Sequence, residues 1–123
     1  MGRRSRRAQR LKAPTSEYTD PDGNSLVLRG SLTAAARLEY AQTLAGTTGP
    51  GARAAGTTED AWQRASELLF ERLAAGWTIA GVPIEGQREL LLRYRAASAG
   101  ERAWVRSALR EHCAEHFPDV RAP

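Results

Sequence analysis

The residues whose types and spacing could do chemistry lie near the end of the chain, at 112–116, where the order is His-Cys-Ala-Glu-His. On a helix, the spacing of four residues brings both imidazoles to one face, and a nearby carboxylate can act as a base. This is the H-x-x-E-H pattern of inverted zinc peptidases. His112, Glu115 and His116 would then form a zinc hydrolase site, with Asp119 as the candidate third ligand.

The surroundings of this motif favour a structural role. The pattern lies at the end of a predicted helix, and two histidines there also suit the helix dipole, which attracts partial positive charge at its C-terminal end. Cys113 points about 100° away from either neighbour on a helix, so it is a poor additional ligand. We therefore expect no metal, no cofactor and no enzymatic activity.

A second chemical feature is a cluster of basic residues at the beginning of the chain. Six of the 18 basic residues precede the first acid, Glu17, which leaves 12 basic and 14 acidic residues in the remainder. Guanidinium groups can neutralise phosphates without any defined fold, so this arm is a candidate nucleic-acid-binding segment. Its candidate residues are Arg3, Arg4, Arg6, Arg7, Arg10 and Lys12.

A further basic stripe lies on the predicted last helix, where Arg102, Arg106 and Arg110 recur every four residues. Such spacing puts the three side chains on one face. It is more typical of a solvated face than of a binding site, because Glu101 and Glu111 lie close enough to dilute the positive field.

The elements that must position these residues begin with a β-hairpin. Residues 17–19 and 25–28 flank an Asp-Pro-Asp-Gly-Asn turn at 20–24. The turn also imitates the opening of a calcium-binding loop but lacks the later glycine and glutamate of that loop. A first helix then follows from Ser31 or Thr33 to about Leu44.

Three more helices are predicted after a flexible loop at 45–58, which is rich in Gly, Ala and Thr. Thr57 and Asp60 form a capping-box-like start for the clearest helix, which we expect to end near Gly76. An extended, buried connector at 77–84 could pair with the hairpin. Helices over 85–97 and from a Ser98–Glu101 capping box to just before Pro118 complete the chain.

The predicted fold is thus mostly α, a small single domain in which the N-terminal β-hairpin is followed by about four helices. Residues 1–16 form a disordered basic arm, 17–120 the domain, and 121–123 a tail. A single cysteine excludes an internal disulfide and favours a reducing, cytoplasmic setting. The longest weakly polar stretch falls short of the roughly 20 residues of a membrane span, so we expect no membrane association through a spanning helix.

The order of elements also resembles a known family. The hairpin carries DGNSLVLRGSL, and a helix, a polar loop, a helix with ELLFERL, the segment WTIAGVPI and two more helices follow. This layout, over roughly Glu17 to Val120, is similar to that of the tail-assembly chaperones of long-tailed phages. The resemblance implies binding of a long helical tape-measure protein, without catalysis.

Two functions follow as hypotheses. The leading one is a non-enzymatic cytoplasmic binding or adaptor protein, of the phage tail-assembly chaperone type, that holds a helical protein partner through apolar helical surface. Aromatic residues contribute most per residue at interfaces, although most of those present here are expected in the core. The candidates are Trp62, Phe70, Trp77, Trp104 and Phe117. The alternative is a small nucleic-acid-associated protein that binds phosphates through its arginine-rich arm.

Overall fold

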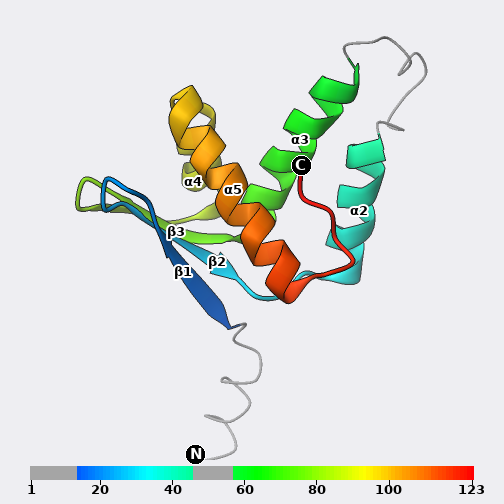
Figure 1. The fold of residues 1–123 in the computed structure, drawn as a ribbon, viewed down its shortest axis with the longest axis horizontal. Helices are drawn as coiled ribbons and strands as arrows, with labels where there is room; N and C mark the ends of the chain where they lie inside the picture. Colours follow the sequence, from blue (N-terminus) through cyan, green and yellow to red (C-terminus); the bar gives the residue numbers. More distant parts are fainter. Residues whose placement is uncertain (1–13, 46–56) are drawn as a thin grey trace, which may run out of the picture.

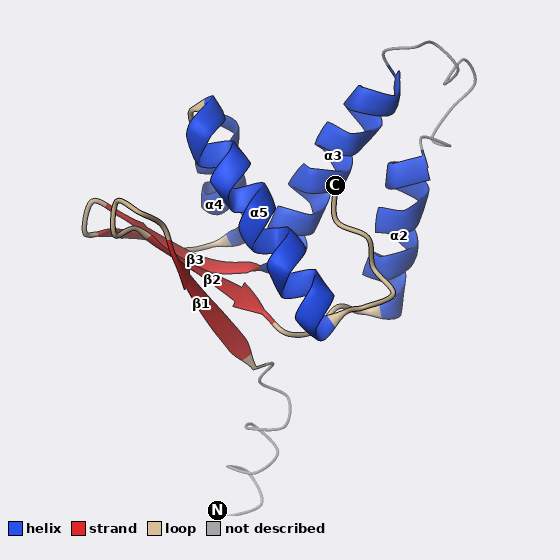
Figure 2. Ribbon diagram, viewed as in Figure 1, coloured by secondary structure: helices blue, strands red, loops and turns tan. Residues whose placement is uncertain are grey.

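The computed structural model describes residues 14–45 and 57–123. Within these ranges the chain forms four helices and one antiparallel sheet with strand order β1-β2-β3-β4 (Figures 1 and 2). Residues 1–13 of the predicted basic arm and residues 46–56 of the predicted loop at 45–58 lie outside the described residues. The elements are β1 Thr15–Thr19, β2 Ser25–Arg29, α2 Ala34–Ala45, α3 Thr57–Leu73, β3 Ala74–Ile79, β4 Val82–Ile84, α4 Gln87–Arg95 and α5 Ala99–His116.

The N-terminal hairpin of β1 and β2 is confirmed. The carboxylate of Asp20 accepts the backbone N–H groups of Asp22 and Asn24 at 2.8 and 2.9 Å, which closes the turn. Gly23 adopts a φ of 85°, a conformation that glycine tolerates best. Strand β1 begins at Thr15, which pairs with Arg29 of β2. The predicted end of the arm at residue 16 is therefore wrong, because residues 15 and 16 are part of the sheet.

The second half of the sheet differs from the prediction. Helix α3 ends at Leu73, and Ala74–Ile79 continues directly as β3, where the helix was expected to reach Gly76. Although alanine favours helices, Ala74, Gly76, Trp77 and Thr78 pair with β2, and tertiary context overrides propensity. The predicted pairing of the 77–84 segment with the hairpin is confirmed. This segment also folds back on itself as β4, so the sheet has twice the expected number of strands.

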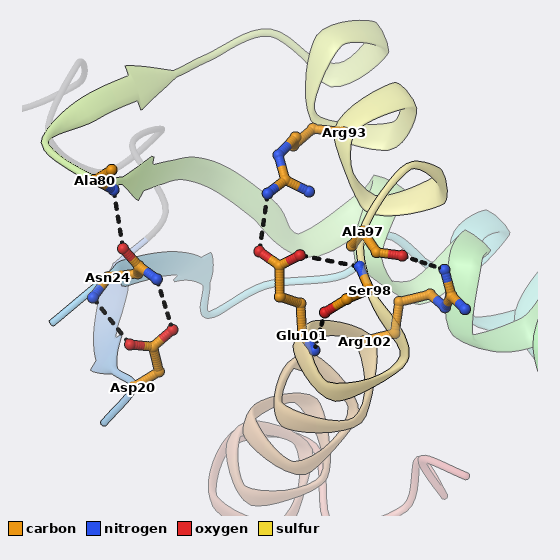
Figure 3. Close-up of polar contacts among 8 residues, drawn as sticks. All are labelled: Asp20, Asn24, Ala80, Arg93, Ala97, Ser98, Glu101 and Arg102. Carbon is orange, nitrogen blue, oxygen red and sulfur yellow. Dashed lines mark hydrogen bonds and ion pairs between the residues drawn. The ribbon is translucent and has the colours of Figure 1, made fainter. Parts of the chain in front are cut away.

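The turn between β3 and β4 consists of Ala80 and Gly81, which both have positive φ, 51° and 78°. Two central residues of this kind make a tight hairpin turn of the I′ class. Asn24 stabilises it, because its side-chain oxygen accepts the Ala80 N–H at 2.9 Å and its amide nitrogen donates to Asp20 at 3.0 Å (Figure 3). The turns of the two hairpins are therefore linked by side-chain hydrogen bonds.

Ala80→Gly should raise the free energy of unfolding by about 1 kcal/mol, because glycine adopts positive φ without the clash that alanine suffers. The matched variant, Gly81→Ala, should lower it by a similar amount. A Cβ at position 81 meets no atom within 4 Å, so the backbone conformation is its main cost. Urea denaturation measures both. Equal and small effects of the two variants would contradict the described turn.

One face of the sheet packs against the helices. Tyr18, Leu26, Trp77 and Ile84 lie opposite one another across the four strands, and all four belong to the core or pack against it. Phe70 of α3 packs against Trp77, and His112 of α5 contacts Tyr18. Sheet and helices thus form two layers around one core.

The helix ends follow local signals. The Ala36 N–H donates to the Thr33 hydroxyl at 3.1 Å, so Thr33 caps α2. The predicted capping box of Ser98 and Glu101 is present at the start of α5. Helix α4 is shorter at both ends than the expected 85–97. The predicted capping box at Thr57 depends on a side chain that lies outside the described residues.

The last residues are part of the domain, which corrects the prediction of a separate tail at 121–123. The backbone carbonyl of Arg121 accepts the hydroxyl of Tyr40, and Ala122 packs against the core. In the described part of the chain, none of the helices has the length and apolar character needed to cross a membrane.

Candidate functional site

A groove with a volume of about 700 Å³ lies where α3, α4 and α5 meet. Each helix contributes polar or aromatic side chains to it, and Pro123 closes one part of its wall. The side chains that bear on its chemistry are Trp62, Gln63 and Glu67 of α3, Arg95 of α4, and Arg102 and Arg106 of α5. We refer to it as the α3–α5 groove.

Three arginines and one glutamate lie among the described side chains that line the groove, so these side chains carry a net positive charge. The Arg95 side chain donates to the Glu67 carboxylate, so these two charges offset each other. Arg102 donates instead to the carbonyl of Ala97, and Arg106 lies close enough to Tyr94 to oppose the rise in pKa that burial causes there. Because their partners are neutral, the charges of Arg102 and Arg106 are not cancelled by these contacts. They are the groove's available cations.

The α4–α5 corner fixes the position of Arg102 (Figure 3). Glu101 accepts the Ser98 N–H at 2.9 Å and pairs with Arg93 at 2.8 Å. The hydrogen bond from the Ser98 backbone, followed by the Arg93 contact, lowers the pKa of Glu101. Glu101, which was expected to dilute the positive charge of the arginine stripe, instead pairs its carboxylate with Arg93.

Arg110, the third arginine of the predicted stripe, has a different environment. It donates to the carbonyl of Pro123 at 2.9 Å and to the Ser107 hydroxyl at 3.0 Å. It is exposed and does not line the groove. Two arginines of the predicted stripe, Arg102 and Arg106, therefore line the groove, whereas Arg110 is hydrogen-bonded to the last residue, Pro123.

The five candidate partner-binding aromatics fall into two groups. Phe70, Trp77 and Phe117 are buried in the core, and Trp104 is half-buried against it. The expectation that most of them are core residues is thus confirmed. Trp62 is the exception, because 53% of its surface is exposed and it lines the groove. The exposed indole of Trp62 and the guanidinium groups of Arg102 and Arg106 thus line the same groove.

His112, from the candidate zinc motif, is completely buried between α5 and the first hairpin. Its Nε2 lies 2.7 Å from the Arg29 carbonyl, which can only accept, so Nε2 carries the proton. Its Nδ1 then accepts the Tyr18 hydroxyl at 2.8 Å. Burial lowers the pKa of His112, so the ring is neutral at neutral pH. The helix-dipole role predicted from its positive charge therefore does not apply to His112.

The other two residues of the motif that could bind a metal, His116 and Cys113, have structural surroundings of their own. His116 Nε2 lies 3.2 Å from the Ser16 hydroxyl, and its ring centre is 4.4 Å from that of His112. Burial raises the pKa of the Cys113 thiol to about 11, so the thiolate is scarce at neutral pH. Among residues 14–45 and 57–123, no group of three or more His, Cys, Asp or Glu residues could hold a metal ion.

The groove draws on residues that the sequence analysis did not single out. Gln63, Glu67 and Arg95 join it through the packing of α3 against α4, for which the sequence carries no local signal. The recurrence of Arg102 and Arg106 was the available hint. The arm residues from Arg3 to Lys12 lie outside the described residues. No family model, curated protein or solved structure matches this chain.

Proposed function

We propose that this protein is a non-enzymatic binding protein that holds an acidic partner in the α3–α5 groove. The observation that carries the proposal is that the half-buried Arg102 and Arg106 line the same groove as the exposed Trp62. Guanidinium groups placed in this way present fixed donors to carboxylates or phosphates. The groove is therefore suited to recognising negative charge.

The chemistry of the groove supports recognition more than catalysis. Arginine keeps its proton throughout the physiological range, so Arg102 and Arg106 donate hydrogen bonds but do not exchange protons with a substrate. Glu67, the acidic lining residue, is engaged by Arg95. Burial raises the pKa of Tyr94, and its hydrogen bond with Arg106 opposes that shift. The Tyr94 hydroxyl therefore stays protonated and neutral in the physiological range.

The partner remains a prediction from the sequence. The resemblance to tail-assembly chaperones implies a long helical chain held in the cytoplasm through apolar surface. The burial of Phe70, Trp77 and Phe117 leaves Trp62 as the most exposed of the five aromatics for that role. Because arginines line the groove, the segment of the partner that enters it should carry acidic groups.

Arg106→Gln should weaken the binding of an anionic probe about tenfold, which corresponds to about 1.4 kcal/mol, because one charge-assisted contact is lost. Two fluorescent probes are titrated at low salt, a glutamate-rich peptide and a single-stranded oligonucleotide, with anisotropy as the readout. Arg88→Gln is the matched control, because Arg88 is exposed on α4 and does not line the groove.

The control should change affinity by about twofold at most, since it removes the same charge from outside the groove. If neither probe binds, or if Arg106→Gln and Arg88→Gln weaken binding equally, the α3–α5 groove is not the binding site. Circular dichroism of both variants confirms that each retains its helices.

A further inference from the structure

We infer that the occupant of the α3–α5 groove is single-stranded nucleic acid, with a base stacked on Trp62 and the adjoining phosphates on Arg102 and Arg106. This inference rests on the proposed function and adds the class of ligand. It combines the two kinds of group that bind a single strand independently of its sequence, an aromatic face and a cationic track. Both line the same groove.

The exposure of Trp62 is the first step of the argument. An indole is the largest apolar side chain, and burying it in the core would stabilise the fold, as Trp77 does. Trp62 instead keeps about half of its surface exposed at the groove. Its neighbours in the core-facing row of α3, Ala61, Ala65 and Leu69, are buried. Trp62 thus lies off the buried face of the helix and is free to contact a ligand.

The arrangement of charge is the second step. Arg102 and Arg106 lie one helical turn apart on α5, so both guanidinium groups serve the same side of the groove. The Ala97 carbonyl orients Arg102, and Arg106 lies near the Tyr94 side chain; both of these neighbours are neutral. Oriented arginines bind phosphate oxygens through more than one N–H, which a flexible surface arginine does less well.

A nucleic acid uses this groove more fully than an acidic peptide would. Carboxylates of a peptide would satisfy Arg102 and Arg106 but would leave the indole face without a specific role. A nucleotide carries both a phosphate and a flat aromatic base, and Gln63, beside Trp62, has amide groups that can contact a base edge. The concave groove favours an unpaired strand, because in a duplex the base faces are stacked and covered.

The basic arm is consistent with this ligand. The six basic residues between Arg3 and Lys12 add phosphate-neutralising charge to the same chain, whatever their placement. An arm of this kind binds the backbone but has no aromatic residue for stacking. We therefore expect discrimination between bases and bare backbone to depend on Trp62 and not on the arm.

The test compares a thymidine oligonucleotide with an abasic oligonucleotide of the same length, which carries the same phosphates without bases. The full chain should bind the base-bearing strand about tenfold more tightly, in the range expected for one stacked base. Trp62→Ala should abolish this preference and leave abasic binding within about twofold. Trp62→Phe should retain most of it, because phenylalanine also stacks. Trp62→Leu should not, although it keeps apolar bulk.

The contribution of phosphate is measured in the same assay by varying salt. Arg106→Gln should weaken both oligonucleotides and reduce the slope of log affinity against log salt by about 0.7 to 1. Leu38→Ala is the control for Trp62, because Leu38 is also a large exposed apolar residue but lies on α2, outside the groove. It should change neither affinity nor slope.

The outcomes separate the inference from the proposed function. If the base-bearing and abasic strands bind equally, or if Trp62→Leu binds as the natural chain does, the nucleic-acid inference is wrong. The proposed function survives that result if a glutamate-rich peptide binds and loses affinity through Arg106→Gln, which would make the occupant an acidic peptide. If Arg106→Gln lowers the affinity for neither the oligonucleotides nor the peptide, both the nucleic-acid inference and the proposed function are wrong.

Discussion

Phe70→Ala is expected to lower the free energy of unfolding by about 3 to 5 kcal/mol, the range for removing a buried aromatic side chain. Phe70 is completely buried. Its ring stacks on Tyr94 with centres 4.7 Å apart and meets the edge of Trp77 at 5.7 Å. It therefore joins α3, α4 and β3, and its loss would leave a cavity at the point where these three elements meet.

The same substitution at Trp62 is the control. Trp62→Ala should change the free energy of unfolding by about 0.5 kcal/mol or less, because more than half of the side chain is exposed. Urea unfolding followed by circular dichroism measures both variants. A small effect at Phe70 together with a large one at Trp62 would reverse the assignment of core and surface on α3, and with it the proposed groove.

These expected effects also show where sequence reasoning reaches its limit on α3. Periodicity predicts the helix, and its buried positions Ala65, Leu69 and Leu73 repeat every four residues. Phe70 and Trp62 are both aromatic residues flanking this row, and local pattern does not separate them. Phe70 is buried because α4 and β3 pack on its side of the helix. That packing is tertiary structure, which the local sequence pattern does not specify.

The parts of the fold that were predicted correctly depend on local signals. The turn after Asp20, the Thr33 cap and the Ser98–Glu101 capping box are each set by residues within five positions of one another. Local hydrogen-bond chemistry of this kind is visible in a sequence. The first hairpin and the positions of four helices followed from it.

The second hairpin could not be found in the same way. Strand β3 forms because β2, about fifty residues earlier in the chain, supplies its partners: Leu26 pairs with Trp77 and Val27 with Gly76. Its turn uses Ala80 at positive φ, where the usual signal is asparagine or aspartate followed by glycine. The helix-favouring alanines before Gly76 then made α3 look longer than it is.

The groove and the contacts of the histidines could not be predicted either, because both are formed by residues far apart in the sequence. Arg95, Arg102 and Glu67 meet through the packing of three helices, and Tyr18 reaches His112 across 94 positions. The sequence showed the histidine spacing but not the burial that decides its chemistry. The two histidines of the motif that suggested metal binding thus form hydrogen bonds between α5 and β1.

Burial of His112 predicts that the protein loses stability in mild acid. The pKa of His112 is lowered from its ordinary value of 6.5, mainly by burial, so the unfolded chain binds a proton more readily than the folded one. The stabilisation is fully present above pH 6.5 and declines as the pH falls from there through the folded pKa, by up to about 1.4 kcal/mol per pH unit. Protonation at Nδ1 would also remove the acceptor of the Tyr18 hydroxyl.

His112→Ala should lower the free energy of unfolding at neutral pH by about 3 kcal/mol, because it opens a cavity and leaves the Arg29 carbonyl and the Tyr18 hydroxyl without their partner. His112→Gln is the sharper variant, since its neutral amide can donate to Arg29 and accept from Tyr18. It should cost less at neutral pH and flatten the decline below pH 6.5. Urea unfolding at several pH values between 5 and 8 measures both effects. If His112→Gln shows the same acid sensitivity as the natural chain, the pH dependence comes from another group.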